Sequence, residues 1–223
     1  MDVSEFAYNN AQWCDAVCRA HAIAGRFSYD AWTSPLRTPP LYPDAVTLRP
    51  GVDPVALLSG IDASPGCSIK DSFCDVDLGP AGFIVLFWGW WIYYEPGVPR
   101  TSSWSNVADE QTFRAWEWEW IAHGGAPNVL RPALLEAPGV SVLADIRDGE
   151  VVAGAVAYRA GSVVGLSNNF TRDDNSWDGC RDAVVSRYPD ITIVAYEAQD
   201  GIAFPQQSGF EPVAPVRVWV RPQ

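Results

Sequence analysis

Three stretches of alternating apolar and polar residues, joined by two very short turns, constrain the fold of this chain most strongly. They run over Val140–Arg147, Val151–Arg159 and Ser162–Ser167. The first two are joined by Asp148-Gly149, a pair that favours the tight turn of a β-hairpin, and Ala160-Gly161 supplies the second turn. Because alternation with a period of two is typical of strands, the sequence predicts three consecutive antiparallel strands.

The segments around these strands predict an α/β fold. An aromatic and branched run, Phe83–Tyr94, is expected to form a buried strand. Helices are expected from Asn106 to Gly124, and over Trp177–Tyr188 with Arg181 turned outward. The other expected elements are helices at Asn9–Ala24, Pro54–Ser59, Arg131–Glu136 and Gly201–Ser208, and strands at Ile191–Tyr196 and Glu211–Val220. This order predicts a three-layer α/β fold with a mixed, mostly antiparallel central sheet flanked by helices.

The composition and charge exclude several classes of protein. The chain has 223 residues, of which 48% are hydrophobic and 19% charged, as is typical of a globular protein. A net charge of -12 argues against a nucleic-acid partner and favours a basic partner or a cationic substrate. The most apolar run, Phe83–Tyr94, is shorter than the roughly 20 residues that span a bilayer, and the N-terminus does not resemble a secretion signal. We therefore expect no membrane partner.

The cysteines indicate a cytoplasmic location. They number five, an odd count without regular spacing, which favours reduced thiols. Cys14, Cys18 and His21 lie on one face of the expected first helix, a pattern that could hold a soft metal. Because no fourth ligand is near in sequence, we favour simple packing of small side chains and expect no metal.

The C-terminal two thirds of the chain resemble a known fold family. The segment from Gly201 to Val213 reads as a short helix, then Gly209-Phe210, then a final strand. With the strand at Val164–Phe170 and the element order from Phe83 onward, it resembles the GNAT fold of acetyl-CoA-dependent N-acetyltransferases. The resemblance implies a GNAT-like domain over residues 76–223, with residues 1–75 as a helical and Pro-rich extension packed on it.

Two features of that family are altered here. Its members open a helix with the turn Arg/Gln-x-x-Gly-x-Gly/Ala, whose backbone N–H groups bind the pyrophosphate of coenzyme A. The corresponding turn keeps Arg172, the candidate cofactor-binding residue, but has side chains at the glycine positions and adds Asp173, Asp174 and Asp178. The family's tyrosine acid, five residues before the Phe of Gly-Phe, corresponds to Pro205. We therefore expect no cofactor, with acetyl-CoA as the cofactor of the alternative function.

Catalytic candidates lie at the ends of strands. A ligand crevice is expected between the strand ending at Ser167 and the strand ending at Tyr196. There Tyr196 and Glu197 are candidate catalytic residues, because a carboxylate beside an apolar crevice has a raised pKa and can act as a general base. Asp145 could act in the same way from the hairpin. A helix cap or a surface charge remains the structural alternative for these carboxylates.

Substrate contacts are expected from polar groups and from tryptophans. The candidates are Ser167, Asn168, Asn169, Lys70, Trp90 and Trp116. The two asparagines could orient a polar ligand or simply form an Asx turn. Lys70, the only lysine, is either an anchor for an anionic group or a solvated surface residue. The tryptophans could line a pocket or belong to the core.

Three functions fit these observations. The first is a GNAT-like small-molecule enzyme that does not use acetyl-CoA in the ordinary way, such as a catalyst of ring closure or acid/base chemistry in bacterial natural-product biosynthesis. The second is an acetyl-CoA-dependent N-acetyltransferase with an atypical cofactor turn. The third is a non-catalytic binding or partner subunit, and a homo- or hetero-oligomer fits any of them.

Overall fold

The structure, a computed structural model, describes residues 2–98, 100–173 and 176–223. The chain forms two compact units that interleave in sequence. Unit 1 contains Met1–Ile92, Tyr196–Ile202 and Pro212–Gln223, and unit 2 contains Tyr93–Ala195 and Ala203–Glu211. This division does not follow the linear boundary near residue 75 that the resemblance implies, and that boundary stays a prediction.

Unit 1 is built on a sheet with the strand order β1-β2-β3-β4-β11-β5. Its elements are α1 (Val3–Ala20), β1 (Arg26–Phe27), β2 (Ala31–Thr33), β3 (Ala45–Thr47), α2 (Pro54–Ser59), β4 (Ser68–Asp71), η1 (Gly79–Ala81), most of β5 (Ile84–Tyr94) and most of β11 (Glu211–Val220). The short helix at Pro54–Ser59 and the strands β5 and β11 confirm the expected elements. The expectation that β5 is a buried strand was wrong for its first half, where Ile84, Leu86 and Trp88 are exposed. In this part of the chain, no helix combines the length and apolar character needed to cross a membrane, and the same holds for the other described residues.

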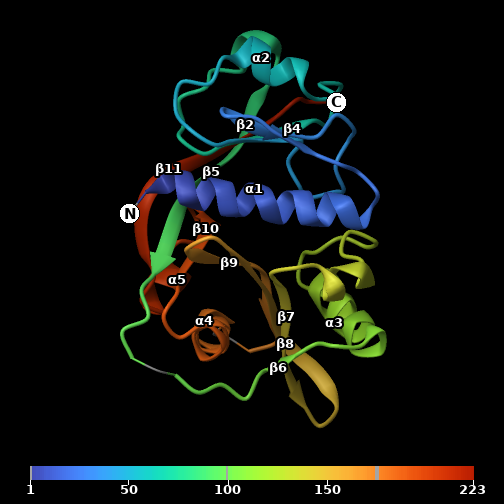
Figure 1. Cartoon of the computed structure of the whole chain (residues 1–223), viewed down its shortest axis with the longest axis vertical. Coiled ribbons are helices and arrows are strands. Elements are labelled where there is room, and N and C mark those ends of the chain that lie inside the picture. The colour runs from blue at the N-terminus through green and yellow to red at the C-terminus, as the bar shows by residue number, and fades with distance from the viewer. Residues whose placement is uncertain (1, 99, 174–175) are drawn as a thin grey trace. The chain divides into compact units, whose positions relative to one another are not determined.

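Two helices cover opposite faces of the unit 1 sheet. Lys70 and Ile69 are neighbours on β4, so their side chains point to opposite faces. Lys70 faces α1, the long helix that crosses the sheet in Figure 1, because its Nζ donates a hydrogen bond to Asn10 (2.8 Å). Ile69 packs on the other face with Leu57 of α2 and with Trp219. Helix α1 begins earlier than expected from the sequence, because Asp2 caps it by accepting a hydrogen bond from the Ser4 N–H (2.9 Å).

The strands β1–β4 lie in and around the Pro-rich stretch Pro35–Pro54, whose composition predicts an ordered surface wrap or a linker rather than strands. A buried carboxylate organises this region. Asp44 accepts hydrogen bonds from the backbone N–H groups of Thr38 (2.9 Å) and Ser68 (3.0 Å), and from Arg37 Nη1 (2.9 Å). These bonds join residues up to 24 positions apart, so local sequence patterns do not reveal them.

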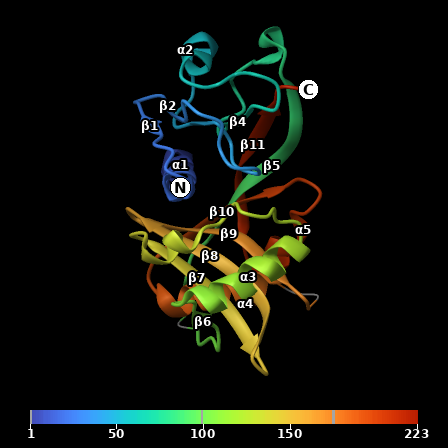
Figure 2. The same cartoon turned by 90° about the vertical axis from the view of Figure 1, so that its right-hand side faces the viewer.

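Unit 2 is a five-stranded mixed sheet between two helices. Its strand order is β10-β9-β8-β7-β6, antiparallel except for the parallel pair β10–β9. Its elements are β6 (Ser105–Asn106), α3 (Glu110–Ala122), η2 (Pro132–Glu136), β7 (Val140–Arg147), β8 (Glu150–Ala160), β9 (Val163–Thr171), α4 (Ser176–Arg187), the first part of β10 (Thr192–Ala198) and α5 (Ala203–Gln207). Helices α3 and α4 lie on opposite faces of β7–β9 (Figures 1 and 2).

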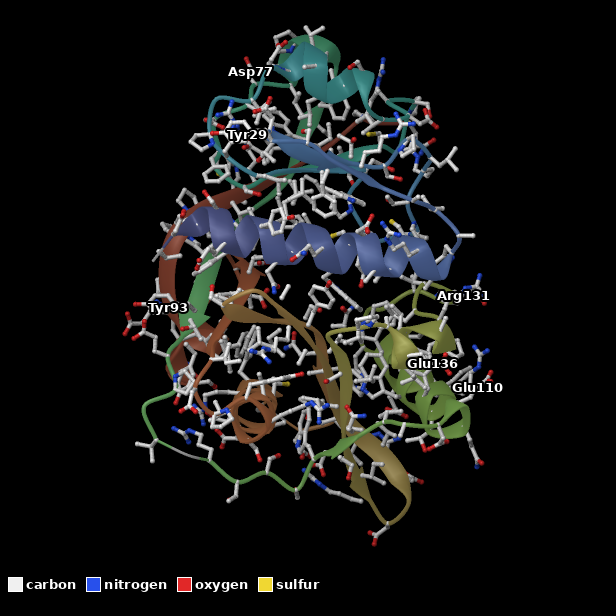
Figure 3. All side chains as sticks on the ribbon, viewed as in Figure 1. Tyr29, Asp77, Tyr93, Glu110, Arg131 and Glu136 are labelled. Atoms are coloured by element: carbon white, nitrogen blue, oxygen red, sulfur yellow. The ribbon has the colours of Figure 1, made fainter. Side chains whose placement is uncertain are left out.

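This architecture confirms the predicted fold class, a mixed and mostly antiparallel sheet flanked by helices. The three consecutive antiparallel strands are present, and Asp148 (φ 52°) and Gly149 (φ 83°) both adopt the left-handed conformation that the tight hairpin turn requires. Helix α3 begins at Glu110, labelled in Figure 3, rather than at Asn106. The reason is that Asp109 is the N-cap and accepts a hydrogen bond from the Thr112 N–H (2.8 Å).

Candidate functional site

Strand β9 contains a bulge at the three polar residues that the sequence predicts as substrate contacts. Ser167 pairs with Val156 and Phe170 pairs with Gly154, so two residues of β9 oppose one residue of β8. Asn168 has a φ of 54°, in the left-handed region. The strand therefore continues to Thr171, and the expectation that it ends at Ser167 was wrong. Ser167, Asn168 and Asn169 are all partly exposed, and their role in substrate binding stays a prediction.

Arg172, at the position of the family's anion-binding turn, is held by two carboxylates. Its Nη2 and Nε donate to the two oxygens of Glu119 (2.6 and 3.0 Å), and its Nη1 donates to Glu150 (2.8 Å). The same hydrogen bonds lower the pKa of Glu119 and raise the pKa of Arg172. Every guanidinium nitrogen of Arg172 is therefore engaged with a carboxylate.

A second arginine joins the hairpin to the turn that follows β9. Arg147 Nη1 lies 2.8 Å from Asp173, and Arg147 Nη2 and Nε donate to Asp145 (2.7 and 3.0 Å). Asp145 is 7% exposed, so its carboxylate is both buried and held. This pairing gives Asp145 a structural partner, while its expected catalytic role stays a prediction. Asp174, which the sequence places in the same turn, lies outside the described residues.

Gly209 and Phe210, the Gly-Phe pair on which the resemblance is partly based, follow the C-terminal end of α5. Gly209 has a φ of 84°, and a side chain there would contact the Tyr94 ring at 3.4 Å. Phe210 is buried and packs against Tyr94 and Trp177, with ring centroids 5.6 and 5.2 Å apart. Arg181 donates to the carbonyl oxygen of Ser208 (2.5 Å) and is only 7% exposed, so its expected outward orientation was wrong.

The two tryptophans predicted to contact substrate differ in burial. Trp116 is fully buried, and its Nε1 donates to the carbonyl oxygen of Leu143 (3.0 Å). Its ring occupies the space above Gly154, where a Cβ would overlap both Trp116 and Phe170. Trp90 on β5 is partly buried. Trp116 thus packs in the core of unit 2, and a substrate role for either tryptophan stays a prediction.

Two predicted site residues meet in unit 1, although 126 positions separate them in the sequence. Lys70 Nζ lies 3.6 Å from the centroid of the Tyr196 ring, and Trp91 contacts the same tyrosine edge-on with centroids 5.7 Å apart. Lys70 is only 2% exposed, so the expectation of a solvated surface lysine was wrong. Asn10 and Trp91 complete this group. No local sequence pattern indicates these two residues, because the sheet and α1 bring them together.

Glu197 follows Tyr196 on β10 and folds back over the next turn. Its Oε1 accepts a hydrogen bond from the Ala198 N–H (2.9 Å), and a Cβ at Gly201 would lie 2.9 Å from the same oxygen. Burial raises the pKa of Glu197, with a smaller contribution from Asp200 that acts in the same direction. The direction of this shift agrees with the sequence expectation, while the catalytic role of Glu197 stays a prediction.

We compared the sequence and the structure with those of known proteins. No family model matches the sequence, and no curated protein matches it. A GCN5-related N-acetyltransferase from Kribbella flavida aligns over 99% of this chain and 96% of its own, with a TM-score of 0.68 and 15% identity. A GNAT-family protein from Novosphingobium aromaticivorans aligns over 97% of this chain and 99% of its own, with a TM-score of 0.58 and 12% identity.

A third structure extends the same comparison. An acetyltransferase of the GNAT family from Colwellia psychrerythraea covers 92% of this chain and 87% of its own, with a TM-score of 0.51 and 10% identity. The protein therefore has a GNAT-like fold, as the resemblance implies. The alignments with the first two structures also include the N-terminal 75 residues, for which the minimal family pattern has no counterpart. At these identities the comparison shows the fold alone.

Proposed function

We propose that the protein is a small-molecule enzyme that uses the GNAT-like fold without the ordinary capture of acetyl-CoA. The proposal rests on Arg172. In the family's cofactor turn, an arginine and bare backbone N–H groups face a pyrophosphate. Here the arginine donates to Glu119 and Glu150, and Asp173 beside it pairs with Arg147. An incoming polyanion would have to displace two carboxylates and approach a third.

The chemistry that remains is acid/base chemistry, and Glu197 is the proposed general base. A carboxylate whose pKa is raised by burial gives up and takes a proton closer to neutral pH than an exposed one. One of its oxygens is held by the Ala198 N–H, which fixes the carboxylate in place. Proton abstraction or ring closure on a small substrate suits this group. Tyr196, the preceding residue of β10, remains a second proposed catalytic residue, with its side chain on the opposite face of the strand. Free thiols at all five cysteines are compatible with the cytoplasmic location that we propose.

Ligand-dependent thermal unfolding tests this proposal. A ligand at about 100 times its dissociation constant stabilises the folded state by about 2.7 kcal/mol, which raises Tm measurably. We expect acetyl-CoA and coenzyme A at millimolar concentration to leave the Tm unchanged. A saturable rise in Tm with either compound would sink the proposal.

Acetyl transfer is the second candidate, and one observation favours it. The parallel pair β9–β10 covers only Thr192–Val194 with Val163–Gly165 among the described residues, although both strands are longer. The residues of β9 after Gly165 therefore lie outside this parallel pairing, and they lead to Arg172, at the position that the resemblance assigns to coenzyme A binding. Under this candidate, Arg172 would exchange its two carboxylates for the pyrophosphate when coenzyme A binds.

A further inference from the structure

Among the described residues, three of the four buried charged side chains of unit 1 belong to ion pairs, and the fourth, that of Lys70, does not. Three buried aspartates each pair with an arginine: Asp15 with Arg19, Asp44 with Arg37 and Asp71 with Arg217. The fourth buried charge of this unit is the ammonium group of Lys70. In the described part of the chain, no carboxylate oxygen lies within 4.0 Å of Lys70 Nζ. One positive charge is therefore left over.

Within the part of the chain that the structure describes, the hydrogen bond and ring contacts of Lys70 are with neutral groups. Nζ donates to the Asn10 side-chain oxygen (2.8 Å) and lies over the faces of Tyr196 (3.6 Å from the centroid) and Trp91 (6.0 Å). An ammonium group has three N–H donors, so one hydrogen bond and two ring faces do not replace a carboxylate. Removing an uncompensated charge from water is costly, so an opposite charge brought close to it would be favourable.

Tyr196 connects this charge with the surface. Lys70 is 2% exposed, whereas Tyr196 is partly exposed and its ring contacts both Lys70 and Trp91. A phenol whose ring is fixed can donate its O–H in a defined direction. A cation behind the ring favours a negative group as the acceptor. The chain has a net charge of -12, but the charge nearest to the Tyr196 ring is the positive ammonium group of Lys70. At this position a negatively charged ligand is therefore favoured.

We propose that Tyr196 and Lys70 form a subsite for the carboxylate group of a small-molecule ligand. The Tyr196 hydroxyl donates to a carboxylate oxygen, and Lys70 supplies the compensating charge from beneath the ring. The inference goes beyond the proposed function, because Tyr196 and Glu197 are adjacent on β10 and their side chains point to opposite faces of the sheet. The subsite favours an anionic ligand, in contrast to the cationic substrate that the net charge of the chain suggests.

The experiment exploits the fact that Lys70 is the only lysine in the chain. Lysine labelled with carbon-13 at Cε gives one side-chain NMR signal, which is shifted by the ring current of Tyr196. The probe is sodium benzoate, with benzylammonium chloride as a control of similar shape and opposite charge, both at constant ionic strength. We expect benzoate to move the signal saturably and benzylammonium to leave it in place.

Variants separate the subsite from nonspecific binding. Because Lys70→Met removes the labelled residue, benzoate binding to the variants is followed by the rise in Tm. We expect Lys70→Met to weaken benzoate by about tenfold, as loss of a charge-assisted contact does, and Lys70→Arg to restore binding in part. Tyr196→Phe keeps the ring, so the lysine signal should stay shifted while benzoate binds more weakly.

Three results would overturn the subsite. They are the absence of a saturable benzoate effect in the wild type, equal benzoate binding by Lys70→Met, and tighter binding of benzylammonium than of benzoate. Any of these three results can be obtained even if acetyl-CoA does not raise the Tm. In that case the carboxylate subsite is refuted and the proposed function is not. A rise in Tm with acetyl-CoA would instead refute the proposed function, so the two failures are distinguishable.

Discussion

The ammonium nitrogen of Lys70 lies 3.6 Å from the centroid of the Tyr196 ring, on the face of the unit 1 sheet that carries α1. The next residue on the same strand, Asp71, lies on the other face and pairs with Arg217 at 2.6 Å. Adjacent residues of β4 thus carry a compensated charge on one face and an uncompensated charge on the other. That contrast has consequences for stability as well as for binding.

Replacing Lys70 with Met should stabilise the protein. Met fills a similar volume and leaves no charge to desolvate. Replacing buried ion pairs by apolar residues of similar volume is often neutral or stabilising by about 1–4 kcal/mol, and Lys70 has no paired carboxylate to leave behind among the described residues. Urea unfolding of the two proteins at one pH measures the change. The matched control is Arg217→Met, which leaves Asp71 buried without its partner and should cost about 3–5 kcal/mol. A loss of stability in Lys70→Met would mean that the charge is compensated after all.

Glu197 should make stability depend on pH. Burial raises its pKa in the folded state above the ordinary value of 4.5, so the folded protein binds this proton more tightly than the unfolded chain does. Its contribution is therefore fully present below pH 4.5 and is lost as the pH rises through the folded-state pKa. We expect the stability of the wild type relative to Glu197→Gln to fall over that interval, as measured by urea unfolding at several pH values.

Glu119 provides the control of opposite sign. Its hydrogen bonds with Arg172 lower its pKa, so its contribution is present above the ordinary value of 4.5 and is lost as the pH falls. Glu119→Gln should therefore lose stability relative to the wild type as the pH rises through the acid range. Parallel pH profiles for Glu119→Gln and Glu197→Gln would contradict one of the two assignments, and the sign of the common slope would tell which.

Releasing Arg172 should uncover an anion-binding group. The double variant Glu119→Gln with Glu150→Gln removes both negative partners while keeping the shape of the side chains. Its affinity for inorganic pyrophosphate should exceed that of the wild type by about two- to fivefold, the size expected for exposed ion pairs. Calorimetric titration measures this gain. The control Glu110→Gln, on the same helix but paired with Arg114, should show none.

Gly154 should tolerate no side chain. A Cβ at this position would overlap the Trp116 indole and the Phe170 ring, and both side chains are buried. Gly154→Ala should therefore cost about 1–3 kcal/mol by overpacking. Gly97→Ala is the control, because a Cβ there meets no atom within 4 Å, and it should change the unfolding free energy little. Similar stabilities for the two variants would show that α3 can shift away from β8.

The elements that local patterns predict well are those whose stabilising contacts are local. The hairpin follows from Asp148-Gly149 alone, and α2 follows from Pro54 together with Asp53, whose side chain accepts a hydrogen bond from the Val55 N–H (3.1 Å). The strands β3 and β4 are joined instead by contacts between distant residues, such as the pairing of Ala45 with Ile69 and the hydrogen bond from the Ser68 N–H to Asp44, 24 positions away. Contacts between residues that are distant in the sequence cannot be predicted from local sequence patterns, so these strands were not predicted from the sequence.

The same distinction applies to the candidate site. The sequence pointed to Arg172, Lys70 and Tyr196 as individual residues, and the structure places each of them. Their partners could not be predicted, because Glu119 lies 53 positions from Arg172, and Asn10 lies 60 positions from Lys70. The partners decide the chemistry. They engage Arg172 with two carboxylates, whereas Lys70 has no carboxylate partner among residues 2–98, 100–173 and 176–223.

The most direct test of the central claim is calorimetric titration of the wild-type protein with coenzyme A. Since Arg172 is engaged by two carboxylates, we predict no saturable binding heat up to millimolar concentration. Saturable binding at micromolar concentration that is lost in Arg172→Gln would contradict the account and would identify the turn after β9 as a working coenzyme site.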